Sequence, residues 1–256
     1  MGIEVLEKIT NTYERKARLY PAFLLLLPIV MLVVGVYGVA LDRNTTVVGM
    51  LATFGVFYLA ASIVRERGTK LEKSLFREWG GKPTTQLLRH RNTGIDPITK
   101  DRYHTFLSRH LGTIFPTKYS EATDPVAADD VYESATKWLL DKTRDKKVFE
   151  LLFEELIAYG FRRNCLGIKP FAIIVSLGAF IWPLVVNGVL TIRGINVNPF
   201  DSFSTRVWGS IVISLCMFFV WVFFVTRNTV KTAAFRYAHR LLSSCDVLSE
   251  IERLQH

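Results

Sequence analysis

The stretch PFAIIVSLGAFIWPLVVNGVLTI, residues 170–192, runs for 23 positions without a charged side chain. Residues 19–41, 44–64 and 207–226 are equally free of charge, over 23, 21 and 20 positions. A helix needs about 20 apolar residues to cross a bilayer, because each residue advances it by about 1.5 Å. A buried helix of a soluble core has a shorter apolar run, of roughly 10–14 residues. The sequence therefore predicts an all-α integral membrane protein with four transmembrane helices.

The four predicted spans form two helical hairpins with a cytoplasmic helical domain between them. The tight outer turn of the first hairpin is predicted at Asp42-Arg43-Asn44. The predicted spans lie at about 20–41, 45–64, 170–192 and 207–226. The chain is then divided into an N-terminal segment and first hairpin (1–65), a basic helical domain (66–169), a second hairpin (170–227) and an amphipathic helical tail (228–256).

Lys and Arg residues set the orientation, because cytoplasmic loops carry an excess of them. The two predicted outer connections hold Arg43 alone, and Arg193 with Arg206. The N-terminal segment, both ends of the central domain and the start of the tail are richer in basic residues. We therefore expect both termini and the central domain on the cytoplasmic side. The residues assigned to the membrane interface just before the third span are Arg162, Arg163 and Lys169.

The central domain carries its positive charge in its first half. Residues 65–109 contain eleven Lys or Arg against five acids, whereas residues 110–169 contain nine against ten. Predicted helices at about 83–91 and 97–111 would bring the basic residues of both onto one surface if they form a hairpin. Such a surface suits phosphates, which Arg side chains and helix N-termini bind, and bases, which stack on aromatic rings. The residues predicted to bind an anion or oligonucleotide are Lys82, Arg89, His90, Arg91, Lys100, Arg102, Tyr103, His104 and Arg109.

Two other interpretations of these charges remain open. The basic residues can be attracted to anionic lipid headgroups, at about 1 kcal/mol per side chain. They can also form ion pairs within the domain. The segment Gly80-Gly81-Lys82-Pro83-Thr84 does not match a phosphate-binding GxxxxGK[ST] loop, because Pro follows the Lys, and an ordinary turn explains it better.

The sequence gives little sign of catalysis. It contains no HExxH, GxSxG or EF-hand pattern, and no Arg lies five to seven residues before a His, as one class of helical ribonucleases requires. His104 and His110 are six residues apart, which does not place two ligands on one helical face. The three cysteines show no metal-ligand spacing. We therefore expect no enzyme, no cofactor and no metal site.

The predicted spans contain no ionisable residue, which argues against a proton relay. Asn187 is the one amide well inside a span, and it is the candidate pore-lining residue. Four spans are few for enclosing a conduit, so any pore requires a homo-oligomer, with a tetramer as one candidate. The tail offers either a coiled-coil seam or an amphipathic helix docked on its own domain. The seam residues are Val230, Ala234, Tyr237, Leu241, Ser244, Leu248 and Ile251.

Several segments resemble those of bacterial membrane proteins, notably residues 85–91, Thr99-Lys100, Arg102-Tyr103-His104 and residues 159–164. The layout, with spans flanking a basic helical domain, resembles membrane effectors of anti-phage defence systems, nearest the membrane channel component of the Hailong system. That resemblance implies an oligomeric ion channel of the bacterial inner membrane. It also implies control by the single-stranded oligodeoxyadenylate product of a partner nucleotidyltransferase. The alternative is a membrane-anchored scaffold that binds anionic lipid or a protein partner.

Overall fold

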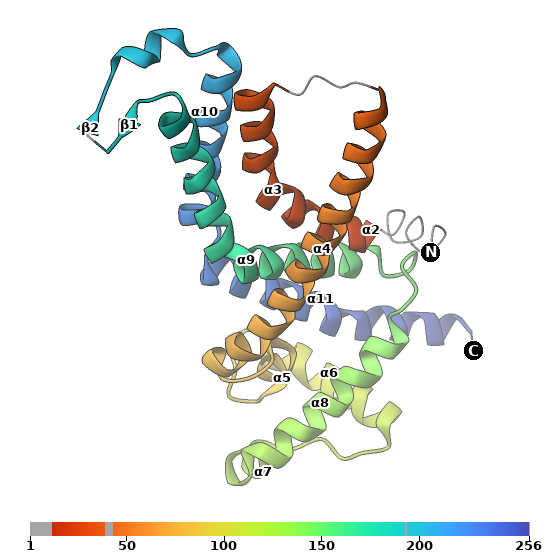
Figure 1. Cartoon of the computed structure of the whole chain (residues 1–256). Helices are drawn as coiled ribbons and strands as arrows, with labels where there is room; N and C mark the ends of the chain where they lie inside the picture. Colours follow the sequence, from red (N-terminus) through yellow and green to blue (C-terminus); the bar gives the residue numbers. More distant parts are fainter. Residues whose placement is uncertain (1–11, 39–42, 193, 256) are drawn as a thin grey trace. The chain divides into compact units, whose positions relative to one another are not determined.

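The structure of the chain is a computed structural model that describes residues 12–38, 43–192 and 194–255, with the backbone alone for residues 43–53. The described chain is mostly helical, as predicted. It divides into two compact units. We call residues 1–71 and 160–230 the membrane unit, and residues 72–159 and 231–256 the helical unit. Figure 1 shows the course of the chain through its elements.

The membrane unit contains the apolar helices. Within the described residues, three helical stretches are long and apolar enough to cross a membrane: Thr12–Tyr37, Glu150–Val186 and Thr205–Phe224. The elements of this unit are α2 (Thr12–Glu14), η1 (Arg15–Leu19), α3 (Tyr20–Leu32), η2 (Val33–Tyr37), the first part of α4 (Arg43–Trp79), the later part of α9 (Glu150–Val186), β1 (Leu190–Thr191), β2 (Gly194–Ile195), η3 (Asn198–Ser202), α10 (Thr205–Phe219), η4 (Val220–Phe224) and the start of α11 (Arg227–Leu254).

The three stretches overlap the first, third and fourth predicted spans. The second predicted span, residues 45–64, lies within α4, but the side chains of residues 43–53 are outside the description. Asp42 of the predicted outer turn also lies outside it, and Arg43 begins α4. A membrane protein is thus supported, whereas four spans in two hairpins stay a prediction.

Small residues let helices of the membrane unit approach closely. A Cβ on Gly35 would lie 2.9 Å from the carbonyl oxygen of Arg206 and from Cβ of Ser210, so η2 packs directly on α10. A Cβ on Gly167 of α9 would lie 2.7 Å from the backbone nitrogen of Gly68 in α4. Membrane helices associate through such contacts, because lipid provides no hydrophobic force between them.

The third predicted span is shorter than the sequence suggested, because α9 ends at Val186. Gly188 adopts a left-handed φ of +76°, the amide of Val189 donates to the carbonyl of Leu184 at 2.9 Å, and the amide of Gly188 donates to that of Val185 at 3.1 Å. This pair of bonds is a Schellman ending, which satisfies the last carbonyls of a helix. A two-stranded antiparallel hairpin follows, with Leu190 opposite Ile195. Asn187 consequently lies at the end of the span and not in its middle.

The helical unit begins with the later part of α4 and ends with α11. Between them lie α5 (Pro83–Leu88), α6 (Pro97–Leu111), α7 (Lys118–Thr123), α8 (Pro125–Lys142) and the first part of α9. An Asp-Pro pair begins both α6 and α8, since Pro suits the first helical position and the Asp before it caps the helix. The Asp96 carboxylate accepts from the amide of Thr99 at 2.9 Å, and Asp124 accepts from Ala127 at 3.0 Å. The Gly80-Gly81 pair ends α4, with Gly80 at φ +83°.

The helix predicted at about 83–91 is shorter in the structure, and the short helix α7 was not predicted. α5 ends at Leu88, three residues before the predicted end. Its last carbonyls bond to side chains of α6, since His104 Nε2 donates to the Leu88 oxygen and Lys100 Nζ donates to the Arg89 oxygen. α7 begins with a capping box between Thr117 and Ser120.

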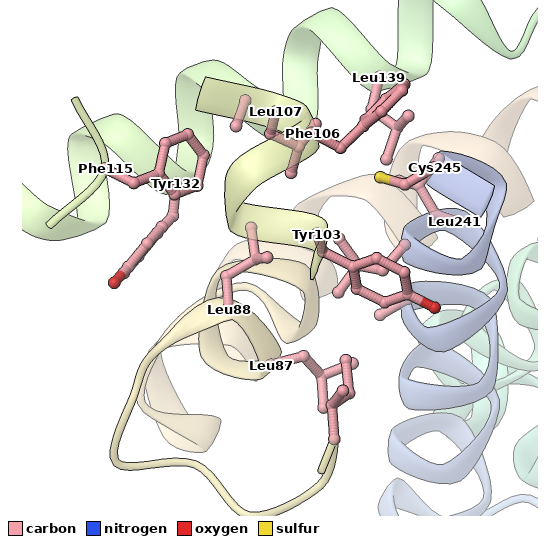
Figure 2. Close-up of a cluster of buried hydrophobic side chains, with 14 of the residues drawn as sticks. Leu87, Leu88, Tyr103, Phe106, Leu107, Phe115, Tyr132, Leu139, Leu241 and Cys245 are labelled. Carbon is pink, nitrogen blue, oxygen red and sulfur yellow. The ribbon is translucent and has the colours of Figure 1, made fainter. Parts of the chain in front are cut away.

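The core of the helical unit joins residues from both ends of the sequence (Figure 2). Leu87 and Leu88 of α5, Phe106 and Leu107 of α6, and Tyr132 and Leu139 of α8 pack with Leu241 and Cys245 of α11. All are nearly inaccessible to solvent. Of the seam residues, Leu241 is fully buried in this core, and Tyr237 and Leu248 pack against it, which favours docking of the tail on its own domain; the coiled-coil interpretation stays a prediction. The domain predicted at 66–169 is completed by this helix.

Candidate anion-binding cleft

Most of the predicted anion-binding residues form hydrogen bonds or ion pairs within the helical unit. Arg89 forms a two-point ion pair with Asp129, with nitrogen–oxygen distances of 2.8 and 2.5 Å, and also donates to the Gly80 carbonyl at 3.0 Å. The Asp129 carboxylate raises the pKa of Arg89, against the opposing effect of burial. Lys82 pairs with Glu133 at 2.5 Å. These cations neutralise the acidic face of α8.

The basic residues of α6 pair with acids of the tail helix. Arg102 donates twice to Asp246, at 2.8 and 3.1 Å, and the hydroxyl of Tyr103 donates to the same carboxylate at 3.2 Å. Arg109 lies 2.7 Å from a carboxylate oxygen of Glu252, and His110 Nε2 lies 2.6 Å from the other. Much of the positive charge on this surface is therefore paired within the domain, which was one of the open interpretations.

The remaining predicted residues differ in exposure. Lys100 is 3% exposed and donates to the carbonyls of Arg89 and Asn92, and burial lowers its pKa. His104 is buried, and this burial lowers its pKa to about 4. His90 Nε2 lies 2.8 Å from the Pro116 carbonyl. Arg91 is exposed, and its side chain has no partner within the described part of the chain.

Another set of residues, which shares only Tyr103 with the predicted anion-binding residues, lines a cavity of about 520 Å³ in the helical unit. This volume is within the range of about 300–1,000 Å³ that small-molecule sites usually have. The loop before α6, the first turns of α6, the early part of α9 and the middle of α11 form its walls. We call it the α11 cleft. Its lining residues are Gly94, Ile95, Asp96, Thr99, Tyr103, Glu155, Arg236, His239, Arg240 and Ser243.

The positive charge of the α11 cleft comes from one face of α11. Arg236, His239, Arg240 and Ser243 follow a spacing of three, four and seven residues, which places them in line along a helix. The side chains of Arg236 and Arg240 are exposed and have no hydrogen-bond or ion-pair partner in the described chain. Partial burial lowers the pKa of His239. This face therefore offers two uncommitted guanidinium groups and an imidazole.

The cleft lining from α6 and α9 carries acceptors. Asp96 is occupied as the N-cap of α6, where it accepts from the amide of Thr99. Glu155 of α9 is half-buried and has no side-chain partner among the described residues. The cleft lining thus includes guanidinium donors and a free carboxylate. A ligand with an anionic group and separate N–H or O–H donors fits both.

Close packing positions the loop that forms one end of the cleft. A Cβ on Gly94 would lie 2.9 Å from Cδ2 of Leu87 and 3.9 Å from Nε2 of His239, so the loop backbone approaches α11. The Gly94 amide donates to the side-chain oxygen of Asn92 at 2.7 Å. The sequence analysis did not select Arg236, His239 or Arg240. Their three- and four-residue spacing was a usable signal, but nothing local indicates which surface they face.

The predicted membrane-interface residues belong to the membrane unit and form hydrogen bonds within it. Lys169 Nζ donates to the carbonyls of Val222 at 3.0 Å and Val225 at 2.8 Å, where η4 ends. Arg162 donates to the Thr229 carbonyl at 3.5 Å, and Arg163 to the side-chain oxygen of Asn164 at 3.4 Å. The amide of Asn187, the pore-lining candidate, donates back to the Pro183 carbonyl of its own helix at 2.7 Å.

Comparison with protein-family models, curated proteins and solved structures finds no match for this chain.

Proposed function

We propose that this protein is a membrane-embedded receptor that binds a nucleotide or short oligonucleotide in the α11 cleft. In this proposal several copies form an ion channel of the bacterial inner membrane, with the helical unit on the cytoplasmic side. Ligand binding changes the conductance of the channel. One observation carries the binding proposal: Arg236 and Arg240 lie on one face of α11, line a cavity and have no partner within the described residues.

The chemistry of the cleft favours a nucleotide over inorganic phosphate alone. Arg side chains bind phosphate oxygens in a planar two-point geometry, and the uncommitted carboxylate of Glu155 accepts from base N–H or sugar O–H groups. A simple anion would meet Glu155 as a like charge. A nucleotide supplies both the phosphate and the donors.

The channel part of the proposal follows from the membrane unit and the element that leads into it. The unit supplies three helical stretches long enough to span a bilayer. α11, which bears the cationic face, begins at Arg227 shortly after η4 ends at Phe224. A ligand held by α11 therefore acts on a helix that follows directly from a span. By the resemblance described above, the ligand would be an oligodeoxyadenylate made by a nucleotidyltransferase.

Binding to the full-length protein in lipid nanodiscs tests the first step. We expect a short fluorescent single-stranded oligodeoxyadenylate to bind, and the affinity to fall steeply with added salt, as phosphate contacts require. The double variant Arg236→Glu/Arg240→Glu should weaken binding at least tenfold. Lys137→Glu/Arg253→Glu is the matched control, because it reverses two exposed cations of the same unit that lie outside the cleft and have no side-chain partner among the described residues. An equal loss in both would contradict the site.

Planar-bilayer recording tests the second step. Currents that change when the oligonucleotide is added, and that stop responding in Arg236→Glu/Arg240→Glu, support a ligand-controlled channel. A silent bilayer with confirmed insertion and intact ligand binding would exclude the channel. Binding that requires anionic lipid and ignores the oligonucleotide would favour the scaffold alternative.

A further inference from the structure

A second group of chemically versatile side chains lies elsewhere in the helical unit, beside the loop that leads into α6. One ring nitrogen of His90, one ring nitrogen of His104 and a carboxylate oxygen of Asp101 all lie within 4.8 Å of one another. Asp101 and His104 are three residues apart and share one face of α6, and His90 follows the end of α5. Two imidazoles and a carboxylate are a ligand set for divalent transition metals.

Hydrogen bonds fix the tautomer of both imidazoles. Nε2 of His104 lies 2.8 Å from the Leu88 carbonyl, and Nε2 of His90 lies 2.8 Å from the Pro116 carbonyl. A carbonyl oxygen can only accept, so each Nε2 carries a hydrogen. In the neutral ring, Nδ1 then keeps its lone pair. Metal-binding histidines usually donate their other ring N–H to a carbonyl or carboxylate in this way.

We propose that His90, Asp101 and His104 form a site for a divalent transition metal, with Zn²⁺ as the expected ion and water as the fourth ligand. The rings of His90 and His104 are nearly perpendicular, with centroids 4.9 Å apart, so they approach the site from different directions. Zn²⁺ holds nitrogen and oxygen ligands at about 2.0–2.2 Å. The three ligand atoms must therefore move closer together when the ion binds. Asp101 can make this movement, because its exposed carboxylate has no side-chain partner in the described chain.

The surroundings suit a site of moderate affinity. His104 is buried and its Nε2 is bonded to the Leu88 carbonyl, so its ring is held in place. The nearby ammonium of Lys100 opposes a cation, although the carbonyls of Arg89 and Asn92 hold it. We therefore expect weaker binding than at a structural site with four protein ligands.

The position of the site gives it a structural effect. His90 precedes the loop of residues 91–96, and Asp101 and His104 follow it. A bound metal would tie the two ends of this loop together. The same loop contributes Gly94, Ile95 and Asp96 to the α11 cleft. Metal binding should therefore stabilise one wall of that cleft, but the metal site itself does not depend on the proposed ligand.

The test is a Zn²⁺ titration of the full-length protein in detergent, without a polyhistidine tag and after treatment with a chelator. We expect one Zn²⁺ per chain by calorimetry, a rise of Tm with Zn²⁺ concentration, and no response to Mg²⁺ or Ca²⁺. Co²⁺ should bind competitively and give visible absorption. His90→Gln and Asp101→Asn should each weaken Zn²⁺ binding at least tenfold.

Two controls separate this site from adventitious binding. Asp130→Asn removes an exposed acid of α8, and His110→Gln removes the other histidine of α6, so both should retain wild-type Zn²⁺ affinity. Asp101→Asn changes an exposed side chain and should leave the fold intact, so it tests the site even if His90→Gln fails to fold. Absence of saturable Zn²⁺ binding by the folded wild type would overturn the proposal. Equal binding by wild type and a folded Asp101→Asn/His90→Gln variant would do the same.

Discussion

The side-chain amide of Asn164 donates a 2.7 Å hydrogen bond to the backbone carbonyl of Ala17, and both residues are fully buried in the membrane unit. This bond joins α9 to η1. The carboxamide oxygen of Asn164 occupies the space that a Cβ on Gly68 would need, so α4 reaches the same point. One buried polar side chain therefore fixes where three helical segments meet.

Replacing Asn164 with Leu should destabilise the membrane unit. The change leaves the Ala17 carbonyl without its donor and inserts a branched side chain beside Gly68. Loss of a buried hydrogen-bond partner costs about 1–3 kcal/mol. Thermal unfolding in detergent would measure the effect, and an unchanged Tm would show that the junction contributes nothing.

Gly167→Ala should lower Tm, whereas Gly178→Ala should not. A Cβ on Gly167 would lie 2.7 Å from the Gly68 nitrogen and force α4 and α9 apart, while a Cβ on Gly178 of the same helix meets nothing within 4 Å. Replacing Gly by Ala in an open helical position favours the helix by up to about 1 kcal/mol. Thermal unfolding in detergent should compare the two variants. Equal shifts in their Tm would argue against the close contact of α4 and α9 at Gly167.

Arg89→Ala should reduce stability and leave ligand affinity unchanged. The Arg89 side chain is 11% exposed and pairs at two points with Asp129, so its loss strands a partly buried carboxylate. We expect a cost of about 1–3 kcal/mol in the free energy of unfolding. Arg144→Ala breaks an exposed pair with Asp141 and should cost about 0–1 kcal/mol. Chemical denaturation compares the two, and weakened oligonucleotide binding in Arg89→Ala would place Arg89 in the ligand site.

Leu241→Ala should cost about 2–5 kcal/mol, because Leu241 is fully buried in the core shared by α5, α6, α8 and α11. Leu254, near the end of the same helix, is 82% exposed, and its replacement by Ala should change little. A small effect of Leu241→Ala on the unfolding of the helical unit would mean that the tail is not part of this core.

Oligonucleotide affinity should increase as the pH falls from about 7.5 to about 5.5. Partial burial lowers the pKa of His239 below its ordinary 6.5, so the ring is neutral at pH 7 without ligand. The groups around it in the cleft are Asp96, Glu155, Arg236 and Arg240. A phosphate beside His239 favours the charged ring, so binding takes up a proton and strengthens at lower pH.

His239→Gln should flatten this pH dependence while the arginines still hold the ligand. A ligand with only phosphodiester groups is required, because terminal phosphates titrate near pH 6 themselves. A wild-type affinity that is constant over this range would remove His239 from the site.

Local chemistry made part of the fold predictable. The apolar stretches are long enough to exclude an ordinary soluble core, and the Asp-Pro pairs at 96–97 and 124–125 locate the starts of α6 and α8, because a cap and its helix are adjacent in sequence. The end of α9 was also encoded locally by Gly188, but the apolar residues beyond it extended the predicted span.

Which segments are apolar, which are helical and where most helices begin can be predicted from the amino-acid sequence, because these properties depend on neighbours within a few residues. Which charges are free depends on the folded structure. Arg102 meets Asp246 across 144 residues of sequence, whereas Arg236 and Arg240 meet no acid within the described chain. It also brought His90 to Asp101 and His104. Pairing and convergence depend on how helices pack, and a charge pattern along the chain does not contain that information.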